Sequence, residues 1–157
     1  MTVFYRPPSL FRMKVINPLV NFLVNRFGLG GQAKQDLIRI LRVKGRTSGR
    51  VYEVPVRIAL LENQRYLMSM LGESQWARNL RVVETAQLVV GTRVENVSAY
   101  ELTAAEKSAF FLWYCRHPEY ELRARYALKA DTQHLTPTEL ERLASLYPVF
   151  RLDPVPS

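Results

Sequence analysis

Two apolar runs of β type, separated only by a short turn, constrain the fold of this chain most strongly. The first run is Leu37 to Val43, and the second, Val51 to Leu60, alternates apolar and polar side chains. In the second run Tyr52, Val54, Val56, Ile58 and Leu60 share one face, which predicts a strand buried on that side. Because only residues 44–50 join the two runs, the sequence predicts an antiparallel hairpin.

Proline in the second run adds a further constraint. Pro55 has no backbone N–H, so it predicts a sheet edge or a bulge at this point of the strand. The same sheet is expected to gain strands at Tyr66 to Leu71, Gln87 to Val90, Arg93 to Leu102 and Pro148 to Leu152. The sequence therefore predicts an antiparallel, barrel-like sheet of five or six strands.

Helix signals surround this sheet. Thr103 and Glu106 form a capping box before a helix over residues 104–115, and Thr136-Pro137-Thr138-Glu139 is a second helix start. Further helices are expected at Pro18 to Phe27, Gln75 to Val83 and Glu119 to Lys129. The fold class is therefore α+β. We expect one domain over residues 1–157, with an N-terminal helical segment (1–35), a barrel core (36–102), and C-terminal helices with the last strand (103–157).

The positive charge of the chain is concentrated in its first 60 residues. These hold 11 Lys or Arg against Asp36 and Glu53, a net charge of +9, whereas the whole chain carries +8. Such a field attracts nucleic acid, an anionic membrane or a phosphate-bearing cofactor. The aromatic residues are not interleaved with basic ones, as they are in nucleic-acid-binding modules, so we expect no nucleic-acid partner. Residues 11–27 form either a membrane-surface helix or a cover for one end of the core.

Cysteine and histidine usage excludes several classes of protein. Cys115 is the only cysteine, so an internal disulfide is impossible, which fits a reducing cytoplasm. Two histidines without a paired C-x-x-C motif predict no dedicated metal site. No apolar run approaches the roughly 20 residues that cross a membrane. We expect a cytoplasmic protein, with peripheral contact at the inner membrane face through residues 11–27 as the alternative.

The turn that joins the two β runs is the first candidate site. Two glycines permit close approach of the backbone, while two hydroxyls and two arginines can hold an anion; these residues are Gly45, Arg46, Thr47, Ser48, Gly49 and Arg50. The alternative is that the segment only reverses the chain.

A second candidate, GESQWARNL, lies where the third strand gives way to a helix. Ser74, Gln75 and Asn79 stand next to Trp76 there, and amide side chains can bind the edge of a heterocycle. Alternatively, Trp76 anchors the core and the polar residues cap the helix. Glu73, in the same segment, would place a carboxylate near the expected anion site.

The order of these elements resembles the deazaflavin-dependent nitroreductase and quinone reductase family. The similar segments are Gly45 to Gly49, Val54-Pro55-Val56 and Trp76 to Leu80, and the resemblance covers about residues 36–102. It implies a flavin-reductase-like split β-barrel that binds reduced coenzyme F-420, an 8-hydroxy-5-deazaflavin.

The resemblance also implies roles for individual residues. Arg46, Thr47 and Ser48 would hold the phosphate and acidic tail of the cofactor. Its ring would lie among Tyr52, Glu53, Val54, Pro55, Val56, Ser69, Met70, Leu71, Gln75, Trp76 and Asn79. Tyr120 falls where the family can place an active-site tyrosine, and Tyr120 or Ser69 would supply a proton.

The implied reaction is hydride transfer from reduced coenzyme F-420 to a small apolar or aromatic acceptor, such as a quinone or a nitroaromatic compound. One alternative keeps the barrel and replaces the deazaflavin with FMN. Another is a non-catalytic protein of the same fold that holds a fatty acid or haem. Exposed barrel edges are compatible with a monomer or a homodimer.

Overall fold

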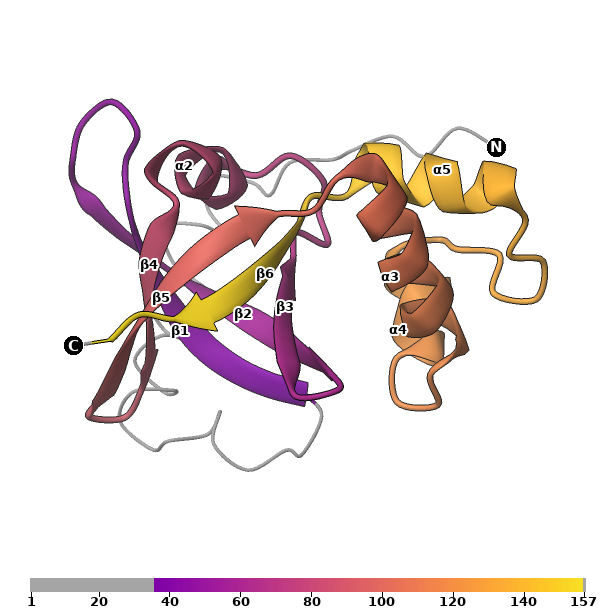
Figure 1. Cartoon of the computed structure of the whole chain (residues 1–157), viewed down its shortest axis with the longest axis horizontal. Coiled ribbons are helices and arrows are strands. Elements are labelled where there is room, and N and C mark those ends of the chain that lie inside the picture. The colour runs from indigo at the N-terminus through magenta and orange to yellow at the C-terminus, as the bar shows by residue number, and fades with distance from the viewer. Residues whose placement is uncertain (1–35, 157) are drawn as a thin grey trace.

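Six strands close into an antiparallel barrel in the computed structural model, which describes residues 36–156. The strands are β1 (Asp36–Lys44), β2 (Val51–Leu61), β3 (Gln64–Met68), β4 (Thr85–Val90), β5 (Arg93–Glu101) and β6 (Val149–Pro154), in the spatial order β1-β2-β3-β6-β5-β4. The helices are α2 (Gln75–Val83), α3 (Ala104–Arg116), α4 (Glu121–Ala127) and α5 (Pro137–Leu146). Figure 1 shows α2 across one end of the barrel and α3, α4 and α5 grouped at one side. The α+β class with about six strands is confirmed.

The predicted hairpin is the longest strand pair of the sheet. β1 and β2 pair from Asp36↔Ala59 to Lys44↔Val51, and their turn projects beyond the barrel (Figure 1). β3 joins β2 only from Ile58 onward, so residues 51–57 have β1 as their single partner among the described strands. Pro55 lies in this one-sided stretch, as its missing N–H requires.

Three apolar clusters are buried in the described part of the chain, and the two large ones lie on opposite sides of the sheet. The cluster inside the barrel contains Val56 and Ile58 of β2, with Leu80 of α2 closing one end. The cluster outside packs α3, α4 and α5 against the sheet and contains Ala59, the residue after Ile58. The alternation along β2 therefore places successive side chains in the two different cores.

The predicted helix starts are confirmed in detail. Thr103 accepts a hydrogen bond from the backbone N–H of Glu106, and the Glu106 carboxylate accepts one from the N–H of Thr103. Thr136 accepts from the N–H of Glu139, with Pro137 at the first position of α5. These local signals were readable because a cap and its helix are neighbours in the sequence.

Two elements end at least two residues earlier than predicted. β3 ends at Met68 instead of Leu71, because Ser69 begins a turn that Gly72 closes by donating its N–H to the carbonyl of Ser69 at 3.1 Å. The helix expected at Glu119 to Lys129 covers only Glu121–Ala127. Lys129 has a φ of 55°, and the N–H of Ala130 donates to the carbonyl of Ala124, which together form a common helix-ending motif. Glycine usually marks this motif in a sequence, and none is present here.

The helix expected at Pro18 to Phe27, and with it the membrane contact through residues 11–27, lies outside the described residues. Within residues 36–156, no helix has the length and apolar character needed to cross a bilayer.

We predict that Cys115 is unreactive in the folded protein. Its side chain lies in the outer core and is 1% exposed, and burial raises the pKa of its thiol to about 12. Because the thiolate is the reactive form, iodoacetamide should modify the folded chain very slowly at pH 8. Mass spectrometry before and after addition of urea gives the measurement, and the single cysteine makes it unambiguous. Equal rates in both states would contradict this placement.

Candidate functional site

The turn between β1 and β2 has a geometry that requires both of its glycines. Gly45 donates its N–H to the carbonyl of Arg50 at 2.7 Å, and Gly49 donates to the carbonyl of Gly45 at 3.1 Å. Gly49 has a φ of +71°, which disfavours any side chain there. A Cβ on Gly45 would lie 2.6 Å from Ser48 Oγ. Two backbone hydrogen bonds therefore close the turn, and the two glycines allow its backbone conformation.

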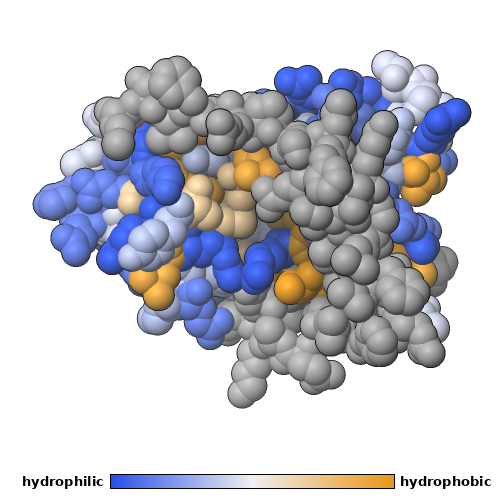
Figure 2. Space-filling view, turned by 180° about the vertical axis from the view of Figure 1, so that it is seen from behind, coloured by the Kyte–Doolittle hydropathy of each residue, from blue (hydrophilic) through white to orange (hydrophobic). Residues whose placement is uncertain are grey.

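In this turn, the hydroxyl of Ser48 is hydrogen-bonded within the turn, whereas the cationic side chains of Lys44 and Arg50 extend from it. Ser48 Oγ accepts a hydrogen bond from the backbone N–H of Arg50 at 3.2 Å and lies 3.5 Å from the Tyr52 hydroxyl. Lys44 and Arg50 are exposed, and neither has an ion-pair partner among the described residues. The hairpin end of the molecule accordingly presents mainly hydrophilic side chains (Figure 2).

Arg46 joins the turn to helix α2. Its backbone N–H donates to Asn79 Oδ1 at 3.1 Å, and its Nη1 donates to the same oxygen at 2.8 Å. Nη1 also lies 3.2 Å from Gln75 Oε1. Asn79 is 5% exposed, so this oxygen is an anchor inside the protein. The two sequence motifs are thus one structural unit, and no carboxylate of the described residues is among the hydrogen-bond partners of the Arg46 guanidinium.

The start of α2 is fixed by a second set of contacts. Ser74 caps the helix by accepting from the N–H of Ala77 at 3.2 Å, and its Oγ lies 2.9 Å from Ser69 Oγ. Ser69 is 2% exposed and donates to the carbonyl of Gly72. Trp76 packs against the inner core, with its ring 6.2 Å from that of Phe150. Ser69 and Trp76 therefore both support the turn that leads into the helix.

The carboxylate of Glu73 is neutralised by its neighbours. Arg81 donates to both of its oxygens, at 2.6 and 3.1 Å, and also binds Glu101 at 2.6 Å. Arg78 lies 3.7 Å from Glu73 on its other side. The hydrogen bond from Arg81 lowers the pKa of Glu73 below its ordinary value. Glu73 therefore adds little negative charge to the neighbouring hairpin turn.

The unpaired part of β2 offers backbone groups instead of side chains. Pro55 lies opposite Ile40 and has no N–H, so these two residues form a non-hydrogen-bonded pair. By alternation, the backbone groups of Glu53, Pro55 and Arg57 point away from β1. From Val51 to Arg57 this edge runs for about 20 Å, starting at the hairpin turn.

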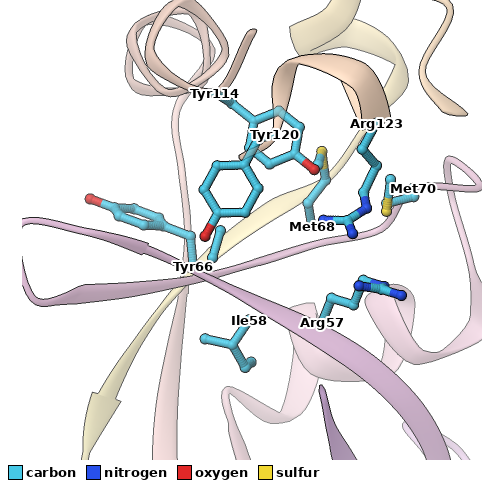
Figure 3. Close-up of a pocket in the computed structure, with 9 residues that line it drawn as sticks. Arg57, Ile58, Tyr66, Met68, Met70, Tyr114, Tyr120 and Arg123 are labelled. Atoms are coloured by element: carbon cyan, nitrogen blue, oxygen red, sulfur yellow. The ribbon is translucent and has the colours of Figure 1, made fainter. Parts of the chain in front are cut away.

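A shallow crevice lies near the far end of this edge, between the sheet and the helices (Figure 3). It is lined by Arg57, Ile58, Ala59, Tyr66, Met68, Met70, Tyr114, Tyr120 and Arg123. The Tyr120 ring stacks on that of Tyr114 with centroids 4.8 Å apart, and its hydroxyl accepts from the N–H of Leu60 at 3.4 Å. Tyr120 and Met70 therefore line the same crevice although they are far apart in the sequence.

The predicted site residues thus fall into two groups. Arg46, Gln75 and Asn79 are in direct contact at the hairpin turn, with Thr47, Ser48 and Tyr52 beside them. Met70 and Tyr120 line the crevice, whereas Ser69 does not. Sequence reasoning missed Arg57 and Arg123 as lining residues. Arg57 could have been found from its place on the polar face of β2, but nothing in the sequence indicates that Arg123 faces inward.

An antiparallel six-stranded barrel with an open strand edge, joined to a basic glycine-containing turn and a W-x-x-N helix start, defines a protein of the split-barrel class. The sequence model of the F-420H(2)-dependent quinone reductase family matches residues 21–137, and the chain belongs to this family. It is therefore an oxidoreductase whose cofactor is coenzyme F-420. This supports the deazaflavin over FMN, and catalysis over passive storage of a fatty acid or haem.

Several solved structures are similar in fold. An F-420-H2-dependent reductase is 20% identical, covers 74% of this chain and 93% of its own, and has a TM-score of 0.48. A domain-swapped dimer is 17% identical, with coverages of 87% and 92% and a TM-score of 0.49. A protein of unknown function from Agrobacterium tumefaciens is 13% identical, with coverages of 76% and 49% and a TM-score of 0.50. No curated protein matches the chain.

We predict that Asn79→Ala detaches the hairpin turn from α2. The substitution leaves two donors of Arg46 without their acceptor, which costs about 1–3 kcal/mol of unfolding free energy. Amide hydrogen exchange of Arg46 should become faster, while exchange at the centre of β1 stays slow. NMR-detected exchange and urea denaturation give the two measurements.

Gln75→Ala is the matched control, because it removes only the longer and more exposed contact of the same guanidinium. It should change both quantities much less than Asn79→Ala. Unaltered exchange at Arg46 in Asn79→Ala would show that the turn holds its shape without α2.

We also predict a pH-dependent contribution from Glu73. Because its pKa is lower in the folded than in the unfolded chain, its contribution to stability is present above about pH 4.5 and is lost as the pH falls further. The difference in stability between the wild type and Glu73→Gln should therefore shrink between pH 7 and pH 4. Its size at pH 7 should stay below about 1 kcal/mol, since the pair is exposed.

Urea denaturation at several pH values gives the measurement for Glu73. Glu119→Gln serves as control, because Glu119 has no ion pair among the described residues. A difference that is constant over this pH range would argue against the contact with Arg81.

Proposed function

We propose that the protein transfers a hydride from reduced coenzyme F-420 to a flat, apolar acceptor of the quinone type. The observation that carries this proposal is the attachment of the basic turn to α2 through Arg46. It produces a rigid cationic end from which the open edge of β2 leads to the crevice with Met70 and Tyr120.

The turn fits the acidic tail of this cofactor. Lys44, Arg46 and Arg50 bring three positive charges to one end of the hairpin, and their only described side-chain partners are the amides that bind Arg46. A single phosphate, as in FMN, needs fewer cations than a tail with a phosphate and several glutamates. Ser48 and Thr47 add hydroxyl groups next to these charges. In this proposal Arg46, Thr47 and Ser48 hold the tail.

The open edge of β2 fits a heterocycle with polar rims. Backbone groups of Glu53 and Pro55 can meet the edge of a ring, while Val54 and Val56 face the barrel core behind it. When bound, coenzyme F-420 supplies a hydride at its ring carbon, which the protein itself cannot provide. The residues Tyr52 to Val56, Ser69 to Leu71, Gln75, Trp76 and Asn79 would form the wall and floor of this ring site.

A quinone that takes up a hydride needs one proton in addition, so that it leaves as a hydroquinone. Tyr120 is suited to this step, because it lines the crevice and carries a phenolic hydroxyl, a group that can act as a general acid. Ser69 already donates to the carbonyl of Gly72. We therefore assign proton donation to Tyr120 and a supporting role to Ser69.

We predict that the double variant Lys44→Gln, Arg50→Gln binds coenzyme F-420 at least about tenfold more weakly than the wild type, because two charge-assisted contacts are lost. The melting temperature should stay the same, since both side chains are exposed. Fluorescence titration with coenzyme F-420, repeated with FMN, gives the measurement. The wild type should prefer the deazaflavin.

The control is Arg93→Gln, Arg116→Gln, which removes the same charge from exposed positions away from the turn. It should bind the cofactor like the wild type. Equally weakened binding in both double variants would show that the turn acts only through the net charge of the protein. Tighter binding of FMN than of coenzyme F-420 would contradict the proposed cofactor site. Oxidation of the reduced cofactor by 1,4-benzoquinone tests the reaction itself.

A further inference from the structure

The turn between β3 and α2 contains two serine hydroxyl groups that contact each other. Ser69 Oγ lies 2.9 Å from Ser74 Oγ and is also hydrogen-bonded to the carbonyl oxygen of Gly72. Ser74 Oγ accepts a hydrogen bond from the backbone N–H of Ala77 at 3.2 Å. Because Ser69 is 2% exposed, water has little access to its hydroxyl.

The number of protons fixes the direction of each hydrogen bond in this group. A hydroxyl group has one proton, and a carbonyl oxygen can only accept. The proton of Ser69 therefore goes to the carbonyl of Gly72, and the contact between the two serines uses the proton of Ser74. Ser74 thus accepts from Ala77 and donates to Ser69, and the Ser69 hydroxyl has no proton left for a substrate.

The segment that follows Ser69 depends on these contacts for its position. Among the described residues, Met70 and Leu71 make no backbone hydrogen bond. Ser69 itself is tied to the barrel, because its N–H donates to the carbonyl of Pro148 at 2.9 Å, and Gly72 donates back to Ser69. The place of Met70 at the crevice is therefore set by the hydrogen bonds of its two neighbours, Ser69 and Gly72.

Ser74 connects the two groups of predicted site residues. On one side it caps α2, the helix whose Asn79 holds Arg46 of the hairpin turn. On the other side it binds Ser69, which precedes Met70 of the crevice. Its single hydroxyl group takes part in both contacts, so the turn and the crevice are held in a fixed relation through one side chain.

We propose that Ser74 is a positioning residue of the reaction and sets the place of Met70 relative to the turn that contains Arg46. This rests on the proposed function, in which the turn holds the tail of coenzyme F-420 and Met70 lies beside its ring. A ring that is held firmly at its tail but loosely at its reacting edge is aligned with the acceptor less often. Loss of this contact therefore slows hydride transfer more than it weakens binding.

The test uses three substitutions that affect the two hydrogen bonds of Ser74 differently. Ser69→Ala removes the acceptor of Ser74 and keeps the cap of α2, Ser74→Ala removes both contacts, and Ser74→Thr keeps both. With reduced coenzyme F-420 and 1,4-benzoquinone, each alanine variant should have a kcat about tenfold lower than the wild type. The KM for the coenzyme in Ser69→Ala should stay within about twofold of the wild type. Ser74→Thr should behave like the wild type.

Thr136→Ala is the matched control for the loss of a helix cap. Thr136 caps α5 through the N–H of Glu139, and it does not line the crevice. This variant should lower the melting temperature about as much as Ser74→Ala does, because each loses one N-cap side chain. Its kcat should equal that of the wild type.

Circular dichroism of the bound coenzyme separates this inference from the proposed reaction. A ring that a protein holds in one orientation gives an induced signal in its visible absorption band. Saturating oxidised coenzyme F-420 should therefore give a weaker signal with Ser69→Ala and Ser74→Ala than with the wild type and Ser74→Thr. If the wild type does not reduce 1,4-benzoquinone but the signals differ in this way, the proposed reaction fails and the positioning role stands.

Three results would overturn the positioning role. The first is a kcat and an induced signal that are the same in the wild type and both alanine variants. The second is a low kcat in Ser69→Ala with a normal one in Ser74→Ala, which would mean that Ser69 acts directly on the substrate. The third is an equal loss of kcat in Thr136→Ala, which would attribute the effect to stability.

Discussion

One buried oxygen atom, Oδ1 of Asn79, organises the end of the molecule at which we propose that the cofactor binds. It accepts hydrogen bonds from both the backbone and the side chain of Arg46, so that the hairpin turn and helix α2 share one anchor. A projecting hairpin without such an anchor would lose backbone order toward its tip. With it, the glycine-shaped turn has a fixed position relative to the open edge of β2. The same contact uses two N–H donors of Arg46 without cancelling its charge.

The partners of arginine side chains differ between the hairpin turn and the rest of the barrel. Elsewhere on the barrel, several arginines are paired with carboxylates, as Arg65 is with Glu95 and Arg81 with Glu73 and Glu101. At the turn, the partners of Arg46 are side-chain amides. They accept its hydrogen bonds but, because they carry no net charge, they do not neutralise its positive charge. The positive charges of Lys44, Arg46 and Arg50 are thereby brought together at the hairpin turn. The sequence suggested that the carboxylate of Glu73 would reduce the positive charge near the turn. In the structure, Arg81 pairs with this carboxylate and neutralises it.

Features that depend on neighbouring residues were predictable from the sequence, and features that depend on distant contacts were not. The hairpin, the Pro55 edge and the caps at Thr103 and Thr136 are local, so their patterns were sufficient. The early end of β3 at Met68 depends on a turn, and the end of α4 depends on the left-handed backbone of Lys129. The crevice joins β2, β3, α3 and α4, and no single segment contains enough of it to be recognised. The roles of the individual site residues stay predictions.

Proline in β2 links the stability of the barrel to its chemistry. A closed barrel normally satisfies the backbone of every strand on both sides, and an open edge invites unwanted pairing. Pro55 removes one donor from the open stretch, and β3 ends before it could cover residues 51–57. Neighbouring Arg57 adds a charge that disfavours pairing with another strand. Among the described residues, a strand edge of about 20 Å therefore has no second neighbouring strand, and Pro55 and Arg57 disfavour its use as a template for aggregation. This stretch of β2 makes fewer hydrogen bonds between strands than the rest of the barrel. The backbone groups of Glu53 and Pro55 that point away from β1 are the ones that can bind a heterocycle.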